Sequence, residues 1–366
     1  MSFYNEYRKY KNFNFENFFA GLTNAKIENI LAKNSITLLD YLALISPLAK
    51  KYIEPMAQKA REITMRHFGK SILMYTPLYL SDHCLNTCLY CGFGAQNAMP
   101  RKQLDDDEIK KEARKISTRG IKHILILTGD APQTATYEYI LACVEMLKKY
   151  FSAIGIEIYA CDKNGYQKFV NSGVDSLTIY QETYNEKLYS SLHPSGPKKD
   201  YIFRLNAPEE ALKAGMRGVN IGALLGINKN FRADAFFTAQ HAQYLQDKFL
   251  DAEISVSFPR ICKGASSFKS VEVSDIELAQ VVAAFRIFMQ RAGITLSTRE
   301  KAVFRNNILP FGITKMSAGC ETSVGGYSGK GGKGQFEMSD KRSVAQIKQA
   351  LLKQGYQPVF KNWDIL

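Results

Sequence analysis

The sequence predicts an α/β protein, a (β/α)8 barrel of the TIM type, closed or partly open. Eight apolar, strand-type runs alternate with helical segments over about 250 residues, the usual length of such a barrel. Strict alternation with short links requires parallel strands covered by helices. The chain has 366 residues and is 46% hydrophobic, enough for one large core. A doubly wound open sheet fits the same alternation, and both architectures place their chemistry at the carboxyl ends of the strands.

Three regions are expected along the chain. Residues 1–70 carry apolar residues at helical spacing without strand alternation and predict an N-terminal helical layer. Residues 71–319 form the barrel, and residues 320–366 are expected to supply a loop and a helix that close it. The predicted strands are 71–81, 123–129, 156–160, 176–180, 219–225, 254–258, 294–297 and 308–319.

The helices between the strands carry recognisable ends. Asp105 with Glu108, and Ser274 with Glu277, have the spacing of a capping box. Helices are predicted from these caps and at 137–150, 166–172, 209–214, 233–249 and 343–354. The segment 325–334 is rich in Gly and Lys, and we expect a mobile loop that serves as a lid.

Composition limits the class of protein. No apolar run reaches roughly 18 residues, the length that crosses a bilayer, so no membrane span is expected. The N-terminus lacks the pattern of a signal peptide, and we expect a cytoplasmic protein. The 48 Lys and Arg exceed the 35 Asp and Glu by 13, which fits nucleic acid, an acidic partner or an anionic substrate. The seven cysteines are an odd number, which argues against a disulfide framework.

Three of the cysteines form the strongest motif. Cys84, Cys88 and Cys91 follow the first predicted strand with the spacing C-x3-C-x2-C. Three thiolates in one loop suit a four-iron, four-sulfur (4Fe-4S) cluster with one iron left open. A zinc site usually needs a fourth ligand, and His83 is badly placed to share the metal of its neighbour. Three buried thiols without a metal are the remaining alternative, and a polar Asn-Thr loop is a poor core segment.

This motif resembles that of the radical S-adenosylmethionine (SAM) superfamily, C-x3-C-x-aromatic-C, with Tyr90 at the aromatic position. The resemblance implies that the open iron binds SAM and that reductive cleavage of SAM gives a 5′-deoxyadenosyl radical. Thr128, Gly129 and Asp130 end the second predicted strand and resemble the motif that holds the SAM amino group. An ordinary strand-to-loop turn is the alternative.

Two further residues are assigned to SAM by the same resemblance. Glu182 follows the fourth predicted strand and is expected to accept hydrogen bonds from the ribose hydroxyls. Arg204 is expected to face the SAM carboxylate, which a guanidinium fork suits. The alternatives are a solvated carboxylate for Glu182 and a surface arginine at a helix start for Arg204.

A narrower resemblance covers the chain from about residue 40 onward. The segments PLYLSDHCLNTCLYCGF, YQETY, GALLG, SVSFPR, LSTRE and KNWD occur in the order seen in the 2-iminoacetate synthase (ThiH) family of tyrosine lyases. A related family, the hydrogenase-maturation tyrosine lyases, carries a second cysteine-bound cluster in a C-terminal extension. Only isolated cysteines follow Cys91 here, which favours the thiazole branch.

The resemblance implies a radical SAM lyase that cleaves the Cα–Cβ bond of L-tyrosine. The products would be 2-iminoacetate (dehydroglycine), for the thiazole of thiamine, and p-cresol. The substrate carboxylate needs a cation, and Arg260 and Arg299 follow the sixth and seventh predicted strands. Ser297 offers a hydroxyl nearby. For each arginine, an ion pair at the barrel rim is the alternative.

The alternatives in function are the hydrogenase-maturation activity, a radical SAM lyase that acts on another aromatic amino acid, and a cluster-containing RNA-binding protein. Dispersed basic residues and the lack of an appended RNA module speak against RNA. We expect the positive charge to serve an acidic partner. The first candidate is a low-potential electron donor, flavodoxin or ferredoxin, and the second is thiazole synthase. His123, His193 and His241 lack ligand spacing and are expected to be structural.

Overall fold

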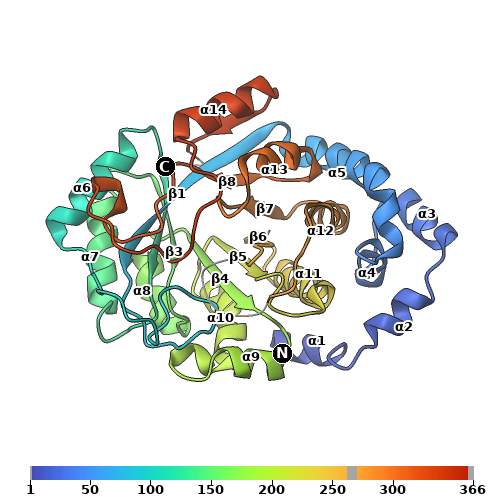
Figure 1. The fold of residues 1–366 in the computed structure, drawn as a ribbon, viewed down its shortest axis with the longest axis horizontal. Coiled ribbons are helices and arrows are strands. Elements are labelled where there is room, and N and C mark those ends of the chain that lie inside the picture. Colours follow the sequence, from blue (N-terminus) through green and yellow to red (C-terminus); the bar gives the residue numbers. More distant parts are fainter. Residues whose placement is uncertain (1, 262–269, 362–366) are drawn as a thin grey trace.

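The barrel is closed and all its strands are parallel. The computed structural model describes residues 2–261 and 270–361, so Cys262 and the end of the KNWD segment lie outside the described residues. β1 pairs with β2 through Thr76–Ser81 and with β8 through Leu73–Tyr75, which closes the sheet and excludes the open, doubly wound alternative (Figure 1). The strands are β1 (Ser71–Ser81), β2 (His123–Thr128), β3 (Ala153–Glu157), β4 (Ser176–Glu182), β5 (Gly218–Ala223), β6 (Glu253–Ser257), β7 (Gly293–Leu296) and β8 (Lys315–Ser317).

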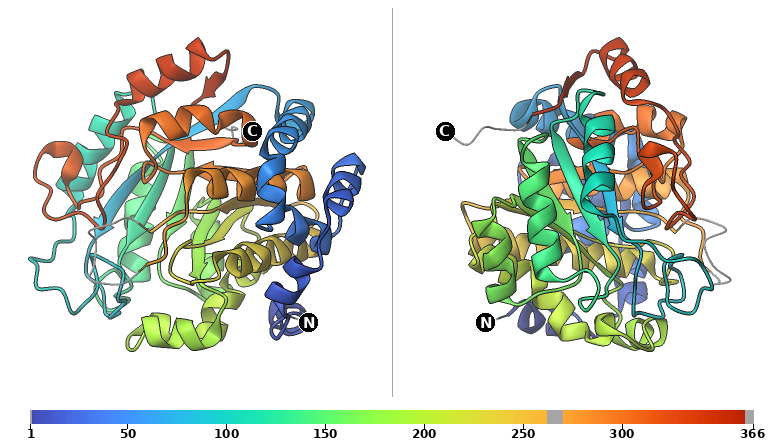
Figure 2. Two further views of the ribbon diagram at one scale, coloured as in Figure 1. Left: turned by 45° about the vertical axis from the view of Figure 1, so that its right-hand side comes forward. Right: turned by 90° about the vertical axis from the view of Figure 1, so that its left-hand side faces the viewer.

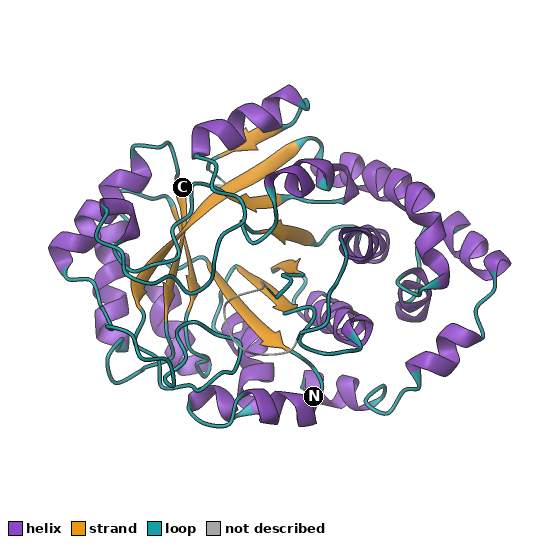
Figure 3. Cartoon of the chain, in the orientation of Figure 1, coloured by secondary structure: helices purple, strands orange, loops and turns teal. Residues whose placement is uncertain are grey.

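Helices surround the strands, as Figure 3 shows. The predicted capping boxes start α6 (Asp106–Ser117) and α12 (Asp275–Phe288). The other helices of this layer are α7 (Tyr137–Leu147), α8 (Lys163–Asn171), α9 (Glu186–Leu192), α10 (Tyr201–Lys213), α11 (Phe231–Lys248) and α13 (Ala302–Asn307). Of these, α9 and α13 were not predicted, and α10 begins eight residues before the predicted start at 209.

The N-terminal helices pack on one side of the barrel, against α11 and α12 (Figure 1). Phe3 stacks on His241 at 3.9 Å between ring centroids, and the Tyr7 hydroxyl donates to the carbonyl of Tyr184 at 2.7 Å. These contacts attach the first helix to the barrel layer. The elements are α1 (Phe3–Arg8), α2 (Phe15–Ala20), α3 (Asn24–Ala32), α4 (Leu38–Leu44) and α5 (Ile53–Phe68).

The C-terminal segment returns to the barrel (Figure 2). α14 (Val344–Lys353) agrees with the predicted helix, and β9 (Gln357–Val359) adds to the start of β1 as an unpredicted parallel strand. Part of the Gly-rich loop is docked on α6, because the buried carboxylate of Glu112 accepts from the backbone N–H groups of Tyr327 and Ser328. This half of the predicted mobile loop is therefore held in place.

Two predicted strands have shifted bounds. β3 starts at Ala153, three residues before the predicted start. The prediction began too late because Gly155 lies inside the strand, and glycine normally weakens a strand. β8 is short, since the start of the predicted run at 308–319 forms a turn of 3-10 helix at Leu309–Phe311 around Pro310. In the part of the chain that is described, no helix is both long and apolar enough to span a membrane.

Candidate active site

The loop after β1 brings the three motif cysteines to the carboxyl ends of the strands. Cys84, Cys88 and Cys91 line one cavity, here called the cysteine pocket. The remaining candidates for SAM, apart from Arg204, line the same cavity. Its wall includes Tyr90, Thr128, Gly129, Asp130, Glu157, Tyr180, Glu182, Lys198, Arg299, Gln335 and Phe336.

The cysteine loop is held by hydrogen bonds to neighbouring elements. The backbone N–H of Leu85 donates to the carbonyl of Asp130 at 3.0 Å, and the Asn86 amide donates to the Asp130 carboxylate at 2.8 Å. A Cβ on Gly129 would lie 2.3 Å from the carbonyl oxygen of His83, so only glycine fits where β2 ends against this loop. The loop geometry therefore depends on the strand end that carries the next motif.

Burial makes the three thiols poor acids in the protein without metal. Burial raises the pKa of Cys84 to about 11 and that of Cys88 to about 12, and it raises the pKa of Cys91 as well. A metal ligand must lose its proton, so binding of iron has to release protons here. No three Cys, His, Asp or Glu side chains of the described chain surround one point closely enough for a single metal ion.

Tyr90 has a defined partner. Its hydroxyl lies 2.8 Å from His193 Nε2, and His193 Nδ1 lies 2.8 Å from the carbonyl oxygen of Tyr189. The carbonyl can only accept, so Nδ1 carries the proton and Nε2 accepts from the Tyr90 hydroxyl. His193 is thus satisfied, as expected, whereas His123 Nδ1 and His241 Nε2 are buried with no hydrogen-bond partner in the described residues.

Glu182 is a buried carboxylate in a strained position. It is 8% exposed, which removes the solvated alternative, and it is the single non-glycine residue with a positive φ (68°) in the described ranges. Such backbone strain concentrates at functional sites. Burial would raise the pKa of Glu182, but Lys198, whose Nζ lies 2.6 Å away, and Arg204 hold it below the usual value.

Arg204 lies behind the carboxylates rather than on the surface. It is 8% exposed, in the first turn of α10, and its Nε donates to the carbonyl of Tyr180 at 2.7 Å. Its terminal nitrogens each lie 4.0 Å from one carboxylate, that of Asp130 and that of Glu182. The three side chains therefore form one charged group beside the cysteine pocket.

A second cavity, the axial pocket, continues from the cysteine pocket toward the barrel axis. Glu157, Tyr180, Arg299 and Phe336 are among the residues that line both. The rest of its wall is mixed: aromatic and small polar side chains, such as Tyr75, Tyr79 and Ser297, lie among aliphatic ones, such as Leu127 and Val282. An aromatic ring with a charged end fits such a lining.

The two candidate arginines differ in position. Arg299 faces both pockets, and its guanidinium carbon lies 3.6 Å from the centroid of the Phe336 ring. Arg260 lines neither pocket: it pairs with Glu300, donates to Asp275 at 2.8 Å and lies over Phe304. Of the two, Arg299 lines the axial pocket, while Arg260 makes the ion pair at the barrel rim.

Glu157 was not among the predicted site residues. It ends β3 and lines both pockets, and no hydrogen bond or ion pair of its carboxyl group is found among the described residues. Burial, and then the negative charge of Glu182, raise its pKa to about 7, against the cations Arg299, Arg204 and Lys198. The carboxyl group therefore exchanges a proton near neutral pH.

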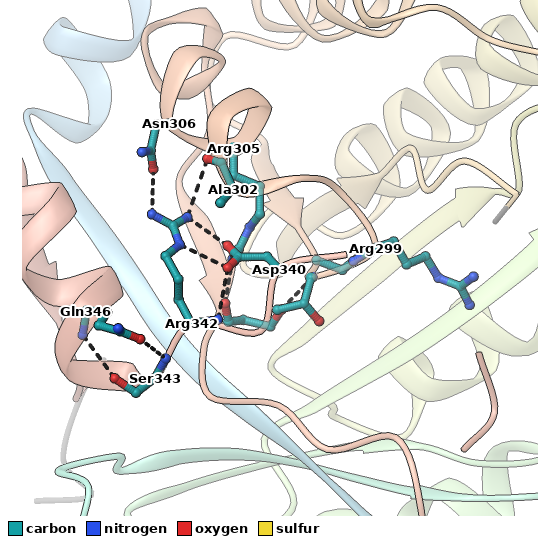
Figure 4. Close-up of polar contacts among 11 residues, drawn as sticks. Arg299, Ala302, Arg305, Asn306, Asp340, Arg342, Ser343 and Gln346 are labelled. Atoms are coloured by element: carbon teal, nitrogen blue, oxygen red, sulfur yellow. Dashed lines mark hydrogen bonds and ion pairs between the residues drawn. The ribbon is translucent and has the colours of Figure 1, made fainter. Parts of the chain in front are cut away.

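The wall beside Arg299 comes from the C-terminal segment. The Tyr79 hydroxyl donates to the Gln335 side chain at 2.8 Å. This segment is anchored by Asp340, which pairs with Arg305 from α13 and with Arg342 (Figure 4). In Figure 4 the Arg299 side chain points away from this network.

Comparison with known proteins assigns the chain to a family. The Radical SAM superfamily matches residues 78–237, and the Biotin and Thiamin Synthesis associated domain matches residues 257–357. The 2-iminoacetate synthases of Salmonella typhimurium and Escherichia coli are 35% and 36% identical to it over 347 residues, which is 94% of this chain and 92% of each relative. The chain belongs to the 2-iminoacetate synthase family. It is a radical SAM enzyme.

The protein is also similar to a solved structure, that of HydG, a maturase of the [FeFe]-hydrogenase. The TM-score is 0.89 at 30% identity, and the match covers 94% of this chain and 79% of HydG. The barrel and its added helices are thus shared between the two.

The radical SAM superfamily uses a 4Fe-4S cluster and SAM. The side chains that line the cysteine pocket of this protein can hold both. Ligands of a cluster bind different iron atoms, so three thiols that line one pocket without meeting at one point suit a cluster better than a single ion. Thr128 Oγ1 is buried and has no partner within the described chain, which leaves a polar atom for a ligand beside Gly129 and Asp130.

Proposed function

We propose that the protein cleaves the Cα–Cβ bond of L-tyrosine to 2-iminoacetate and p-cresol, and so supplies the thiazole of thiamine. The family assignment supports the reaction class. The observation that carries the substrate is the axial pocket, because it joins a cavity with aromatic and aliphatic walls to one cationic side chain, Arg299, next to the cysteine pocket. A zwitterionic amino acid with a phenol ring matches this combination.

In this proposal Cys84, Cys88 and Cys91 hold one 4Fe-4S cluster with an open iron. Thr128, Gly129 and Asp130 hold the amino group of SAM, and Tyr90 lies beside it. Glu182 accepts hydrogen bonds from the ribose hydroxyls. Arg204 neutralises the neighbouring carboxylates of Asp130 and Glu182, and the SAM carboxylate is its predicted ligand. When both are bound, the cluster and SAM supply a 5′-deoxyadenosyl radical.

The chain's own residues position the substrate. Arg299 binds its carboxylate, assisted by the Ser297 hydroxyl, and Phe336 keeps the guanidinium in a fixed plane. Tyr79 and Tyr180 line the pocket toward the axis and, with the C-terminal segment, keep water away from the reacting atoms.

We assign Glu157 the role of proton acceptor. Tyrosine arrives as an ammonium ion, and loss of hydrogen from nitrogen is easier from the neutral amine. Glu157 lies on the wall shared by the two pockets, and a pKa of about 7 suits a general base at neutral pH. The proton then stays on the Glu157 carboxyl group while the Cα–Cβ bond breaks.

The decisive experiment is anaerobic reconstitution with iron and sulfide, followed by SAM, reductant and L-tyrosine. We expect p-cresol and 5′-deoxyadenosine in wild type. Cys88→Ala, which removes a proposed cluster ligand, should form neither product. If wild type forms 5′-deoxyadenosine without p-cresol, the substrate assignment is wrong.

The similarity to HydG favours one alternative, the hydrogenase-maturation activity. Release of cyanide from the same reaction would support it over the thiazole function. Release of glyoxylate and ammonia, the hydrolysis products of 2-iminoacetate, without cyanide would support the proposed reaction.

We further propose a cytoplasmic enzyme that receives electrons from an acidic flavodoxin or ferredoxin and works beside thiazole synthase, without nucleic acid or a membrane. The net charge of +13 supports an acidic partner. The six described cysteines are all free thiols, which fits a reducing compartment.

A further inference from the structure

The opposite mouth of the barrel holds a third, larger cavity. This lower cavity has a volume of about 1010 Å³ and is formed where the strands begin, whereas the cysteine pocket lies where they end. All eight barrel strands contribute, through residues that include Ser71, His123, Ala153, Ser176, Gly218, Glu253, Gly293 and Lys315. It shares one lining residue, Thr295, with the axial pocket.

A lysine without an ion-pair partner lines the lower cavity. Lys315 Nζ lies 3.5 Å from His123 Nε2 and 4.9 Å from the centroid of the Tyr75 ring. No carboxylate of the described chain lies within ion-pair distance of it. Burial lowers the pKa of Lys315 to about 8, although nearby carboxylates oppose this shift. The amine of Lys315 is therefore mostly protonated at pH 7.

Two buried polar atoms at this cavity lack partners. His123 is 5% exposed and its Nδ1 has no hydrogen-bond partner in the described residues; the same holds for Thr295 Oγ1, in a residue that is 6% exposed. An ammonium group can only donate, so His123 Nε2 accepts from Lys315 and Nδ1 carries the proton. Buried donors are normally satisfied, so these two point to a ligand.

The charges around the cavity favour an anion. Three cations (Lys315, Arg217 and Arg291) line it with two carboxylates. Both carboxylates are engaged, because Glu253 pairs with Arg217 at 3.1 Å and Asp175 accepts from the backbone N–H of Ile154 at 2.7 Å. The cavity therefore offers one positive charge in excess, with neutral donors beside it.

We propose that the lower cavity is a second binding site, which takes a small monocarboxylate. Lys315 supplies the charge, and the His123 Nδ1–H and the Thr295 hydroxyl supply hydrogen bonds. One excess cation balances a singly charged anion, whereas a phosphate dianion would leave a charge uncompensated in a partly buried place. The site lies apart from the cysteine pocket and needs neither cluster nor SAM.

The test measures acetate binding to the full chain by saturation-transfer NMR. It uses the Arg299→Met background, so that the axial pocket does not contribute. We expect saturable binding that weakens at least tenfold in Lys315→Met. Arg291→Met, which removes one charge from the rim of the same cavity, should change the affinity less than threefold. Thr295→Val, nearly isosteric, provides a second variant that should weaken binding severalfold.

Three results would overturn the proposal: no saturable acetate binding, equal losses for Lys315→Met and Arg291→Met, or inorganic phosphate binding more tightly than acetate. Thermal unfolding of each variant separates lost binding from lost fold. No substrate or SAM is present in this assay, so its outcome is independent of the tyrosine lyase assignment.

Discussion

Lys198 Nζ lies 2.6 Å from Glu182 Oε1, and both side chains are only 10% exposed. The carboxylate assigned to the ribose of SAM is thus neutralised from within the protein. Lys198 also lies 5.6 Å from the centroid of the Tyr90 ring, and its backbone N–H donates to the Asn86 side chain at 2.9 Å. Lys198 therefore connects the cysteine loop to Glu182, the carboxylate assigned to the ribose.

Lys198→Met should weaken SAM binding about 10- to 100-fold. The change keeps an aliphatic chain against Tyr90 but leaves the buried Glu182 carboxylate without its counterion, so Glu182 takes up a proton more readily and accepts hydrogen bonds less well. The pKa of Glu182 would rise, because Lys198 is the first of the groups that hold it down. The loss of affinity should therefore grow as the pH falls, and equilibrium dialysis against SAM measures it.

The neighbouring Lys199 provides the matched control, because it is exposed. Lys199→Met should bind SAM as wild type does. Equal losses in the two variants would show that general charge, rather than the ion pair with Glu182, is responsible.

Glu157→Gln should abolish the pH dependence of tyrosine cleavage. In wild type the base form of Glu157 appears above its pKa of about 7, so kcat should rise with pH and be roughly tenfold below its plateau at pH 6. The variant should be slow at every pH and should release 5′-deoxyadenosine in excess of p-cresol. An unchanged pH profile in Glu157→Gln would remove Glu157 from the mechanism.

The same group links stability to pH. Its pKa is raised from 4.5, so the folded chain holds the proton more tightly than the unfolded chain. The stability it contributes is complete below pH 4.5 and is lost as the pH rises through about 7. The gain in Tm of Glu157→Gln over wild type should therefore increase between pH 5 and pH 8.

Arg299→Lys should raise the KM for L-tyrosine about 10- to 100-fold with little change in SAM binding. Hydrogen bonds to a charged group contribute about 1.5–3 kcal/mol, and lysine cannot reproduce the bidentate contact. Arg260→Lys should lower the Tm and leave this KM unchanged, because Arg260 is engaged by Glu300 and Asp275. The opposite pattern would make Arg260 the substrate ligand.

Asp340→Asn should destabilise the protein and impair tyrosine binding together. The side chains of Asp340 and Arg305 are fully buried, and breaking such a pair costs about 3–5 kcal/mol, or roughly 4–7 °C in Tm for a chain of this length. The segment with Gln335 and Phe336 would lose its anchor. Asp107→Asn, at an exposed position on α6, should change neither quantity. A stable variant with normal KM would show that the anchor is dispensable.

The sequence predicted most of the barrel because its signals are local. The capping box at Asp105 and the cysteine spacing each lie within a few residues. Parallel strands of a barrel end at one edge, so the positions of Thr128 and Glu182 at two strand ends suffice to predict that they lie beside the cysteines. Their proximity in the cysteine pocket agrees with this placement, and their binding roles remain predictions.

The missed residues depend on long-range contacts. Glu157 was overlooked because the third strand was predicted to end at residue 160, which put Glu157 inside it rather than at its end. Lys198 lies in a single turn of 3-10 helix (Pro197–Lys199) that is fixed by Asn86, more than 100 residues earlier. Gln335 is placed by Tyr79, and no local pattern in a Gly-rich segment indicates such a contact.

The contribution of the C-terminal segment constrains the order of events during synthesis. A Cβ on Gly92 would lie 2.4 Å from the carbonyl oxygen of Gln335, so the cysteine loop packs directly against a residue made some 240 positions later. The anchor at Asp340 emerges from the ribosome later still. The cysteine loop therefore reaches its final enclosure only after residues 335–340 have been translated and have folded against the barrel.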